Sequence, residues 1–92
     1  MEINICPICG FDKLLNPPYD NLGYPSYEIC PCCSFEYGFD DSSEGFTFDS
    51  FRKKWIENGF TFSIKEEMPK NWDKDAMLKQ LDNIKKVNFK LR

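Results

Sequence analysis

The sequence predicts a small α+β domain, with a ribbon of short β-hairpins in its N-terminal half and two amphipathic helices in its C-terminal half. Two Cys-x-x-Cys pairs and alternating aromatic residues predict the ribbon, and a change to helical periodicity after Gly45 predicts the helices. The ribbon alone has too little apolar surface to be stable by itself. We therefore expect one domain, 1–92, in which a ribbon half (1–45) and a helical half (46–92) share a core.

The two cysteine pairs predict a tetrahedral metal site. Cys6-Pro7-Ile8-Cys9 and Cys30-Pro31-Cys32-Cys33 are separated by twenty residues. A Cys-x-x-Cys turn directs two thiolates at one ion, and a second turn supplies the other two, which leaves no open position for water or substrate. Gly10 permits the positive φ that follows such a turn, whereas Ser34 takes that place after the second pair. We expect a structural zinc ion bound by Cys6, Cys9, Cys30 and Cys33.

Iron and thiol redox chemistry are the alternatives for these cysteines. Four cysteines set among aromatic residues also suit a rubredoxin-like iron centre, although zinc is favoured. A thiol redox protein would form a reversible disulfide between Cys30 and Cys33, but a thioredoxin-type pair begins a helix, and neither pair here precedes a helical pattern. Cys32 has the wrong spacing for a two-residue turn with either neighbour, so we expect it not to bind the metal.

Short extended segments and loops fill the rest of the ribbon half. Prolines interrupt the chain between residues 16 and 25, and residues 27–29 and 35–39 have strand patterns on either side of the second pair. An acidic connector, residues 40–45, follows. It partly imitates a calcium loop, but Phe51 stands where the bidentate carboxylate is required, so we expect no calcium there.

The helical half begins with an apolar stripe at Phe48, Phe51 and Trp55. Either Thr47 or Asp49 can cap this helix, and Gly59 ends it. Alternation over residues 60–64 predicts a brief extended segment.

A second helix is expected to start at Asp73 as N-cap, with Trp72 before the cap packing on Met77. Alternating Val87, Phe89 and Leu91 predict a terminal strand.

The residues around both pairs resemble the cysteine-rich CPCC domains, which are small zinc-ribbon-like bacterial proteins. The resemblance covers about the first 40 residues and rests on Cys6-Pro7-Ile8-Cys9-Gly10-Phe11 and on residues 28–37, which include Cys-Pro-Cys-Cys. In those domains the Cys-Pro-Cys-Cys run tends to be the first pair, and here it is the second. The resemblance implies a bacterial, cytosolic, metal-stapled module, in some genomic settings an immunity or accessory protein.

Charge and composition favour a binding module with a protein partner. The formal net charge is −3, and four thiolates around one zinc ion add about −2, which argues against nucleic acid as the partner. The basic runs 52–54 and 85–86 fit solvated helix faces, and a nucleic-acid-binding ribbon would instead depend on residues 52–54. Histidine is absent and no nucleophile motif is present, so we expect no enzyme.

A protein partner fits the aromatic and acidic residues of the ribbon half. Tyr19, Tyr24 and Tyr27 lie in its long loop, and Asp40, Asp41 and Glu44 could steer a basic partner. Residues 1–4 contain neither a basic region nor a long apolar stretch, and no apolar run approaches the roughly 20 residues needed to cross a bilayer. We expect a cytoplasmic protein without membrane association.

Overall fold

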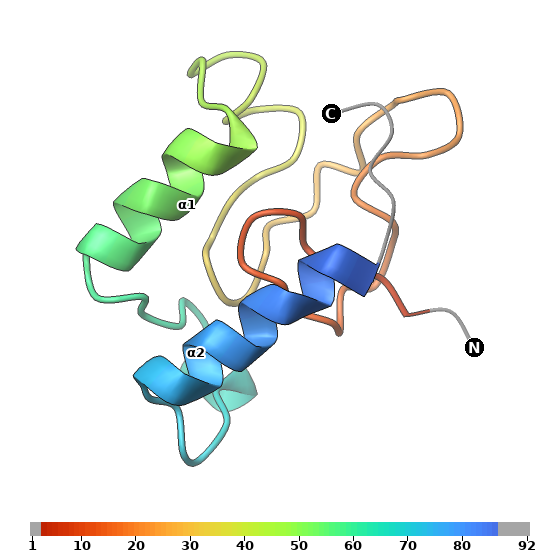
Figure 1. Ribbon diagram of the computed structural model, residues 1–92. Coiled ribbons are helices and arrows are strands. Elements are labelled where there is room, and N and C mark those ends of the chain that lie inside the picture. Colours follow the sequence, from red (N-terminus) through yellow and green to blue (C-terminus); the bar gives the residue numbers. More distant parts are fainter. Residues whose placement is uncertain (1–2, 87–92) are drawn as a thin grey trace.

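The computed structural model describes residues 3–86 and contains two α-helices beside a looped N-terminal half (Figure 1). Helix α1 spans Phe48–Glu57 and α2 spans Lys74–Leu81. The structure also has two short 3-10 helices, η1 (Lys65–Glu67) and η2 (Asp82–Lys86), and η2 directly follows α2. The predicted strand at Val87, Phe89 and Leu91 lies outside the described residues.

The two cysteine turns share one backbone pattern. In knuckle 1 (residues 6–10) the Cys6 N–H donates to the Phe11 carbonyl at 2.8 Å, and the Gly10 N–H donates to the Cys6 carbonyl at 3.0 Å. In knuckle 2 (residues 30–34) the corresponding bonds, Cys30 to Phe35 and Ser34 to Cys30, measure 3.0 and 2.9 Å. The last residue of each knuckle has positive φ. The backbone therefore follows the same path in both turns. They differ in the residue at the position of positive φ, which is Gly10 in knuckle 1 and Ser34 in knuckle 2.

Strand pairing around the knuckles is limited to single bridges within residues 3–86. Ile29 pairs with Glu36 across knuckle 2, and Tyr19 pairs with Pro25 in the long loop. Residues 60–64, predicted to be extended, are irregular, and Phe60 has a φ of 42°. This segment still bonds to knuckle 2, because the N–H groups of residues 63 and 64 donate to carbonyls of residues 32 and 31. The zinc-ribbon class stays a prediction.

Both helices begin at predicted caps. The Thr47 hydroxyl accepts the Ser50 N–H at 3.0 Å, and the Ser50 hydroxyl accepts the Thr47 N–H at 2.9 Å, which completes a capping box. The Asp73 carboxylate accepts the Ala76 N–H at 2.9 Å. At the other end of α1, Gly59 follows the C-cap with a φ of 98°, as predicted for a residue that ends a helix.

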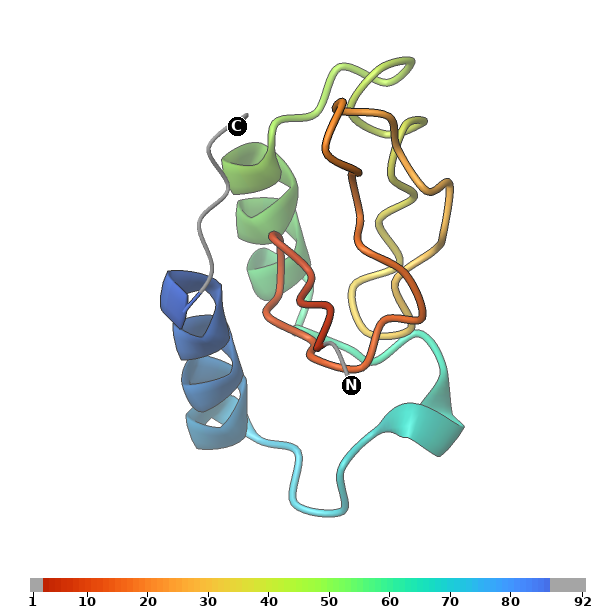
Figure 2. The same cartoon turned by 90° about the vertical axis from the view of Figure 1, so that its right-hand side faces the viewer.

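The hydrophobic core contains both the buried cysteines and a group of packed aromatic rings. Phe35 packs edge-on against Phe51 of α1 with the ring centroids 4.9 Å apart, and Phe62 packs on Trp72 at 4.8 Å. Trp55 is buried, and its indole N–H donates to the Thr61 carbonyl at 2.9 Å. Both halves of the chain contribute to this cluster. In Figures 1 and 2 knuckle 1, drawn in red, lies beside both helices.

Replacing Ser34 by glycine is expected to stabilise the protein. Ser34 has a φ of 67°, where an L side chain costs about 1–2 kcal/mol and glycine does not. Greater freedom of glycine in the unfolded chain offsets part of that gain, so Ser34→Gly should raise the free energy of unfolding by about 0.5–1 kcal/mol. Thermal melting at fixed metal concentration measures it. Ser43→Gly, at a residue without positive φ, should lower stability; a lower melting temperature for Ser34→Gly would contradict the argument.

Candidate metal centre

The two knuckles bring four sulfur atoms together. The Sγ atoms of Cys6, Cys9, Cys30 and Cys33 all lie within 4.8 Å of one another. Cys6 and Cys33 are 3.8 Å apart, and Cys9 and Cys30 are 3.6 Å apart, so each of these contacts joins the two knuckles. All four side chains are buried, and all are free thiols.

These distances fit a tetrahedral thiolate site. A Zn–S bond of about 2.3 Å places ligands about 3.8 Å apart along a tetrahedral edge, close to the separations across the knuckles. A disulfide requires about 2.05 Å, so the sulfurs are spaced as ligands around an ion. The four cysteines thus form a cluster within metal-binding distance.

Burial makes ionised thiolates in this cluster unfavourable unless a cation is bound. It raises the pKa of Cys9 and Cys33 well above the ordinary thiol value, and hydrogen bonding within the cluster adds to the effect on Cys9. Cys6 differs: although burial opposes it, hydrogen bonds from Cys30 and the other neighbours lower its pKa well below the ordinary value. Four thiolates at this position therefore require a bound positive ion.

The buried Tyr37 hydroxyl lies beside the four-cysteine cluster. It is fully buried and makes no hydrogen bond of ordinary geometry, yet it interacts electrostatically with Cys6. Burial, followed by the charges of Cys6, Cys30 and Cys33, raises the pKa of Tyr37, so the hydroxyl keeps its proton. A neutral hydroxyl beside a thiolate can donate to it, and outer-shell donors of this kind orient metal ligands.

Side chains from both helices bind the carbonyls of knuckle 1. The Arg52 guanidinium donates to the Ile8 carbonyl at 2.6 Å and to the Pro7 carbonyl at 2.8 Å. From α2 and η2, the Gln80 amide donates to the Cys9 carbonyl and the Asn83 amide to the Gly10 carbonyl, each at 3.0 Å. Four consecutive carbonyls therefore have side-chain donors, which their burial requires.

These three donors were not predicted from the sequence. Arg52 was expected on a solvated helix face, but it is half-buried and also forms an ion pair with Asp49 at 2.8 Å. Lys54 of the same basic run packs over the Phe46 ring, 4.9 Å from its centroid. A buried turn whose carbonyls have no backbone partner is the signal that could have predicted donors somewhere in the chain, although not which ones.

Loss of the Arg52 contacts is expected to weaken the fold. Arg52→Met keeps much of the apolar stem but leaves the Pro7 and Ile8 carbonyls without these donors, so the free energy of unfolding should fall by about 2–3 kcal/mol. Lys53→Met, at an exposed neighbour on α1, is the matched control and should change it by less than about 0.5 kcal/mol. Urea unfolding of the metal-loaded proteins measures both. Equal stability of the two variants would show that the contacts contribute little.

Cys32 stands apart from the four-cysteine cluster. Its side chain is 1% exposed, and its sulfur lies 3.4 Å from the Gln80 amide nitrogen. Ile8 holds the corresponding position in knuckle 1 and is equally buried. The structure therefore gives Cys32 a packing position beside α2, outside the predicted ligand set.

The acidic connector stabilises the turn that leaves knuckle 2. Asp40 accepts the Glu36 N–H at 2.8 Å, and Asp41 accepts the Gly38 N–H at 2.8 Å and the Tyr19 hydroxyl. Both carboxylates therefore have local partners, and replacing them would perturb the turn as well as the surface charge.

Comparison with known proteins finds two relatives that span nearly the whole chain. The uncharacterized protein YozI of Bacillus subtilis (strain 168) is 36% identical over 114 aligned positions, which cover 99% of this chain and 94% of YozI. The uncharacterized protein YoaQ of the same organism is 32% identical over 101 positions, covering 91% of this chain and 86% of YoaQ. No family model matches, so the resemblance to the CPCC domains stays a prediction. No solved structure matches the chain.

The described residues contain no helix of the length and apolar character that a membrane span requires.

Proposed function

The chain belongs to the same family as YozI and YoaQ of Bacillus subtilis, and we propose that it is a small accessory module, stapled by one structural zinc ion, that binds a protein partner. The observation that carries the zinc site is the cluster of four buried sulfurs, two from each knuckle, at tetrahedral spacing. Four protein ligands complete the coordination of zinc and leave no position for a substrate. A structural ion fits this closed set, and the absence of histidine from the sequence supports a module without enzymatic activity.

Metal analysis tests the zinc site. Protein purified without added chelator should contain one zinc ion per chain, and a thiol reagent should release that ion as the four ligands are modified. A coloured protein that contains iron would mean that the centre is rubredoxin-like and does not bind zinc. A metal-free chain that remains cooperatively folded would overturn the proposal.

The surface proposed to bind the partner is the long loop of the N-terminal half. Five of its large apolar side chains are more than half exposed: Leu15, Leu22, Tyr24, Tyr27 and Ile29. Large apolar side chains that are exposed to solvent are a common feature of protein-binding surfaces. Tyr19, which was expected to share this role, is half-buried and packs against Tyr37 with the ring centroids 6.0 Å apart.

Two carboxylates of this loop hydrogen-bond to its own backbone N–H groups and so hold its conformation. The Asp20 carboxylate accepts the N–H groups of Leu22 and Tyr24, both at 2.9 Å. The Glu28 carboxylate accepts those of Leu15 and Asn16 at 2.9 and 3.1 Å. A loop ordered before binding loses less conformational entropy on association, and the net charge of −3 favours a partner with a basic surface.

Photo-crosslinking in cells tests the partner surface. A photoreactive amino acid in place of Tyr24 should yield one discrete adduct, while the same residue in place of Lys74, exposed on α2, should not. Leu22→Asp should reduce the Tyr24 adduct severalfold because it places a charge on the same loop, two residues from Tyr24. Equal adducts from both positions, or none from Tyr24, would show that the loop is not the binding surface.

A further inference from the structure

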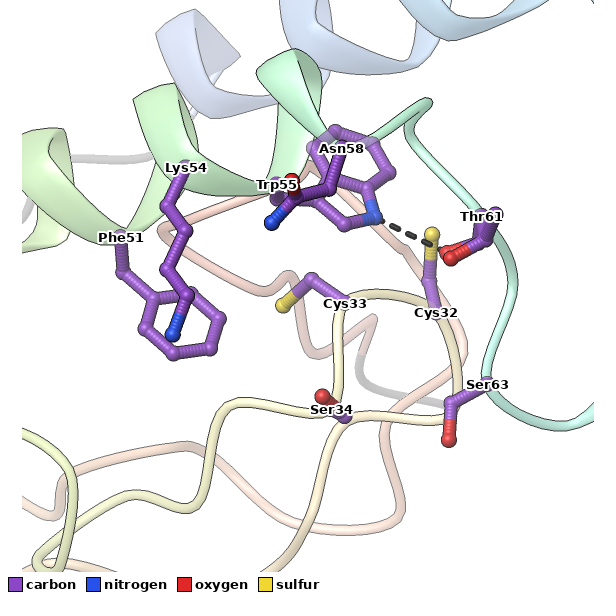
Figure 3. A pocket seen from close by; sticks show the side chains of 9 residues that line it. All are labelled: Cys32, Cys33, Ser34, Phe51, Lys54, Trp55, Asn58, Thr61 and Ser63. Atoms are coloured by element: carbon purple, nitrogen blue, oxygen red, sulfur yellow. Dashed lines mark hydrogen bonds between the residues drawn. The ribbon is translucent and has the colours of Figure 1, made fainter.

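A cleft of about 280 Å³ opens beside the metal centre (Figure 3). Knuckle 2 forms one wall with Cys32, Cys33 and Ser34, and the second half of α1 forms the opposite wall. Thr61 and Ser63 line the remaining side. The cleft therefore lies against one ligand of the four-cysteine cluster.

Cys33 differs from the other three cysteines of the cluster in its exposure. Its relative exposure is 4%, while Cys6, Cys9 and Cys30 are each 0% exposed, and Cys33 is a lining residue of the cleft. In Figure 3 its sulfur is directed toward the side of the cleft where Phe51 and Lys54 lie, whereas the adjacent Cys32 sulfur points a different way. A small molecule in the cleft meets the centre at Cys33.

The lining of the cleft suits a small polar oxidant. Ser34, Ser63 and Asn58 contribute hydroxyl and amide donors, and Lys54 contributes an ammonium group. Within residues 3–86 no ion pair joins Lys54 to a carboxylate, so its charge is not neutralised by a close carboxylate. Such donors can hydrogen-bond to an oxygen that leaves as an anion.

We propose that Cys33 is the oxidation site of the centre and that a hydroperoxide reaches it through this cleft. The Cys33 sulfur attacks one peroxide oxygen, so that an S–O bond forms while the O–O bond breaks. Sulfur is oxidised by two electrons and the peroxide is reduced. The departing hydroxide or alkoxide takes a proton from solvent, and the donors of the cleft stabilise it as it leaves.

Cys6 is the partner for the second step, because its sulfur lies 3.8 Å from that of Cys33. Its thiolate attacks the Cys33 sulfenic acid, so that an S–S bond forms and the S–O bond breaks. The hydroxide released is protonated to water. In total two thiolates, one hydroperoxide and two protons give one disulfide, one alcohol or water, and one further water. The disulfide removes the Cys6 and Cys33 thiolates from the ligand set together, so a bound ion would be released.

This inference rests on the proposed zinc site, and its test starts from zinc-loaded protein. Substoichiometric hydrogen peroxide is added, zinc release is followed with a chromogenic chelator, remaining thiols are alkylated, and the product is digested with trypsin. Cleavage after Lys13 and Arg52 places the two knuckles in separate peptides, 1–13 and 14–52. The expected first product joins these peptides through Cys6 and Cys33, with one zinc ion released per disulfide. A first product that lacks this bond overturns the inference.

Blocking the cleft tests the route. Ser63 lines the cleft and is exposed, so Ser63→Phe should fill its mouth and slow zinc release by peroxide about tenfold at unchanged zinc content. Ser42→Phe, at an exposed residue of the acidic connector, is the matched control and should release zinc at the wild-type rate. Equal rates in the two variants overturn the route through the cleft. If the purified protein contains no zinc, the proposed function is wrong. If it contains zinc but Cys33 is not oxidised first, only this inference is wrong.

Discussion

Removal of the metal is expected to unfold the protein. Five of the thirteen buried residues of the core cluster are cysteines, so the ion would lie within the core. Structural zinc in small domains contributes about 10–16 kcal/mol of binding free energy at pH 7. Whole domains are stable by only about 5–15 kcal/mol, so a core organised around the ion is not expected to survive its loss.

Circular dichroism and tryptophan fluorescence measure this effect. A strong chelator should abolish the cooperative transition, and zinc added in excess should restore it. Cys30→Ser should have the same effect as the chelator because it removes a ligand, while Cys32→Ser is the matched control from the same knuckle and should retain zinc. A Cys32→Ser protein that loses its metal would mean that the ligand set is wrong.

Acid should have the effect of the chelator. Zinc binds the thiolate, so a metal-bound cysteine has a lower pKa in the folded protein than in the unfolded chain. The stability that the ion provides is present above the unfolded-state pKa of about 8.5 and is lost as the pH falls through the folded value, where protons displace the metal. Zinc release and unfolding should therefore coincide in a titration toward low pH, and unfolding that precedes release would contradict the linkage.

Local patterns in the sequence predicted the features that depend on neighbouring residues. The helix caps at Thr47 and Asp73 follow from side chains that reach N–H groups three residues away, and each knuckle follows from a four-residue spacing. The burial of Trp55, expected from its place in the apolar stripe of α1, is also confirmed. These features need no knowledge of the rest of the chain.

The contacts that hold the cysteine cluster against the helices could not be predicted in this way. Gln80 and Asn83 bond to carbonyls 71 and 73 residues earlier in the chain, and Arg52 bonds to carbonyls 44 and 45 residues earlier. Periodicity assigns such side chains to a polar helix face and does not distinguish one that faces water from one that faces a buried turn. The cleft at Cys33 likewise depends on how α1 packs against knuckle 2.

Gly10→Ala is expected to separate α2 from knuckle 1. A Cβ atom at residue 10 would overlap the Gln80 carbonyl oxygen and would lie 2.8 Å from the carbonyl carbon of Gln80 and 3.2 Å from the Leu81 Cα. All three are backbone atoms, so no side chain can turn aside to make room. The helix must move, and the bonds from Gln80 and Asn83 to knuckle 1 are then stretched or lost.

The cost of this substitution has two parts that a matched variant can separate. Gly10 has a φ of 85°, at which alanine costs about 1–2 kcal/mol, and two lost hydrogen bonds add about 2 kcal/mol, so the free energy of unfolding should fall by about 3–4 kcal/mol. Gly45 has a φ of 76° with nothing within 4 Å of the added Cβ, so Gly45→Ala should cost only the backbone part, about 1–2 kcal/mol. Urea unfolding of both metal-loaded variants measures the difference. If they are equally stable, the backbone of α2 does not pack against Gly10; a larger loss for Gly10→Ala shows that glycine is needed there because the helix leaves no room for a side chain.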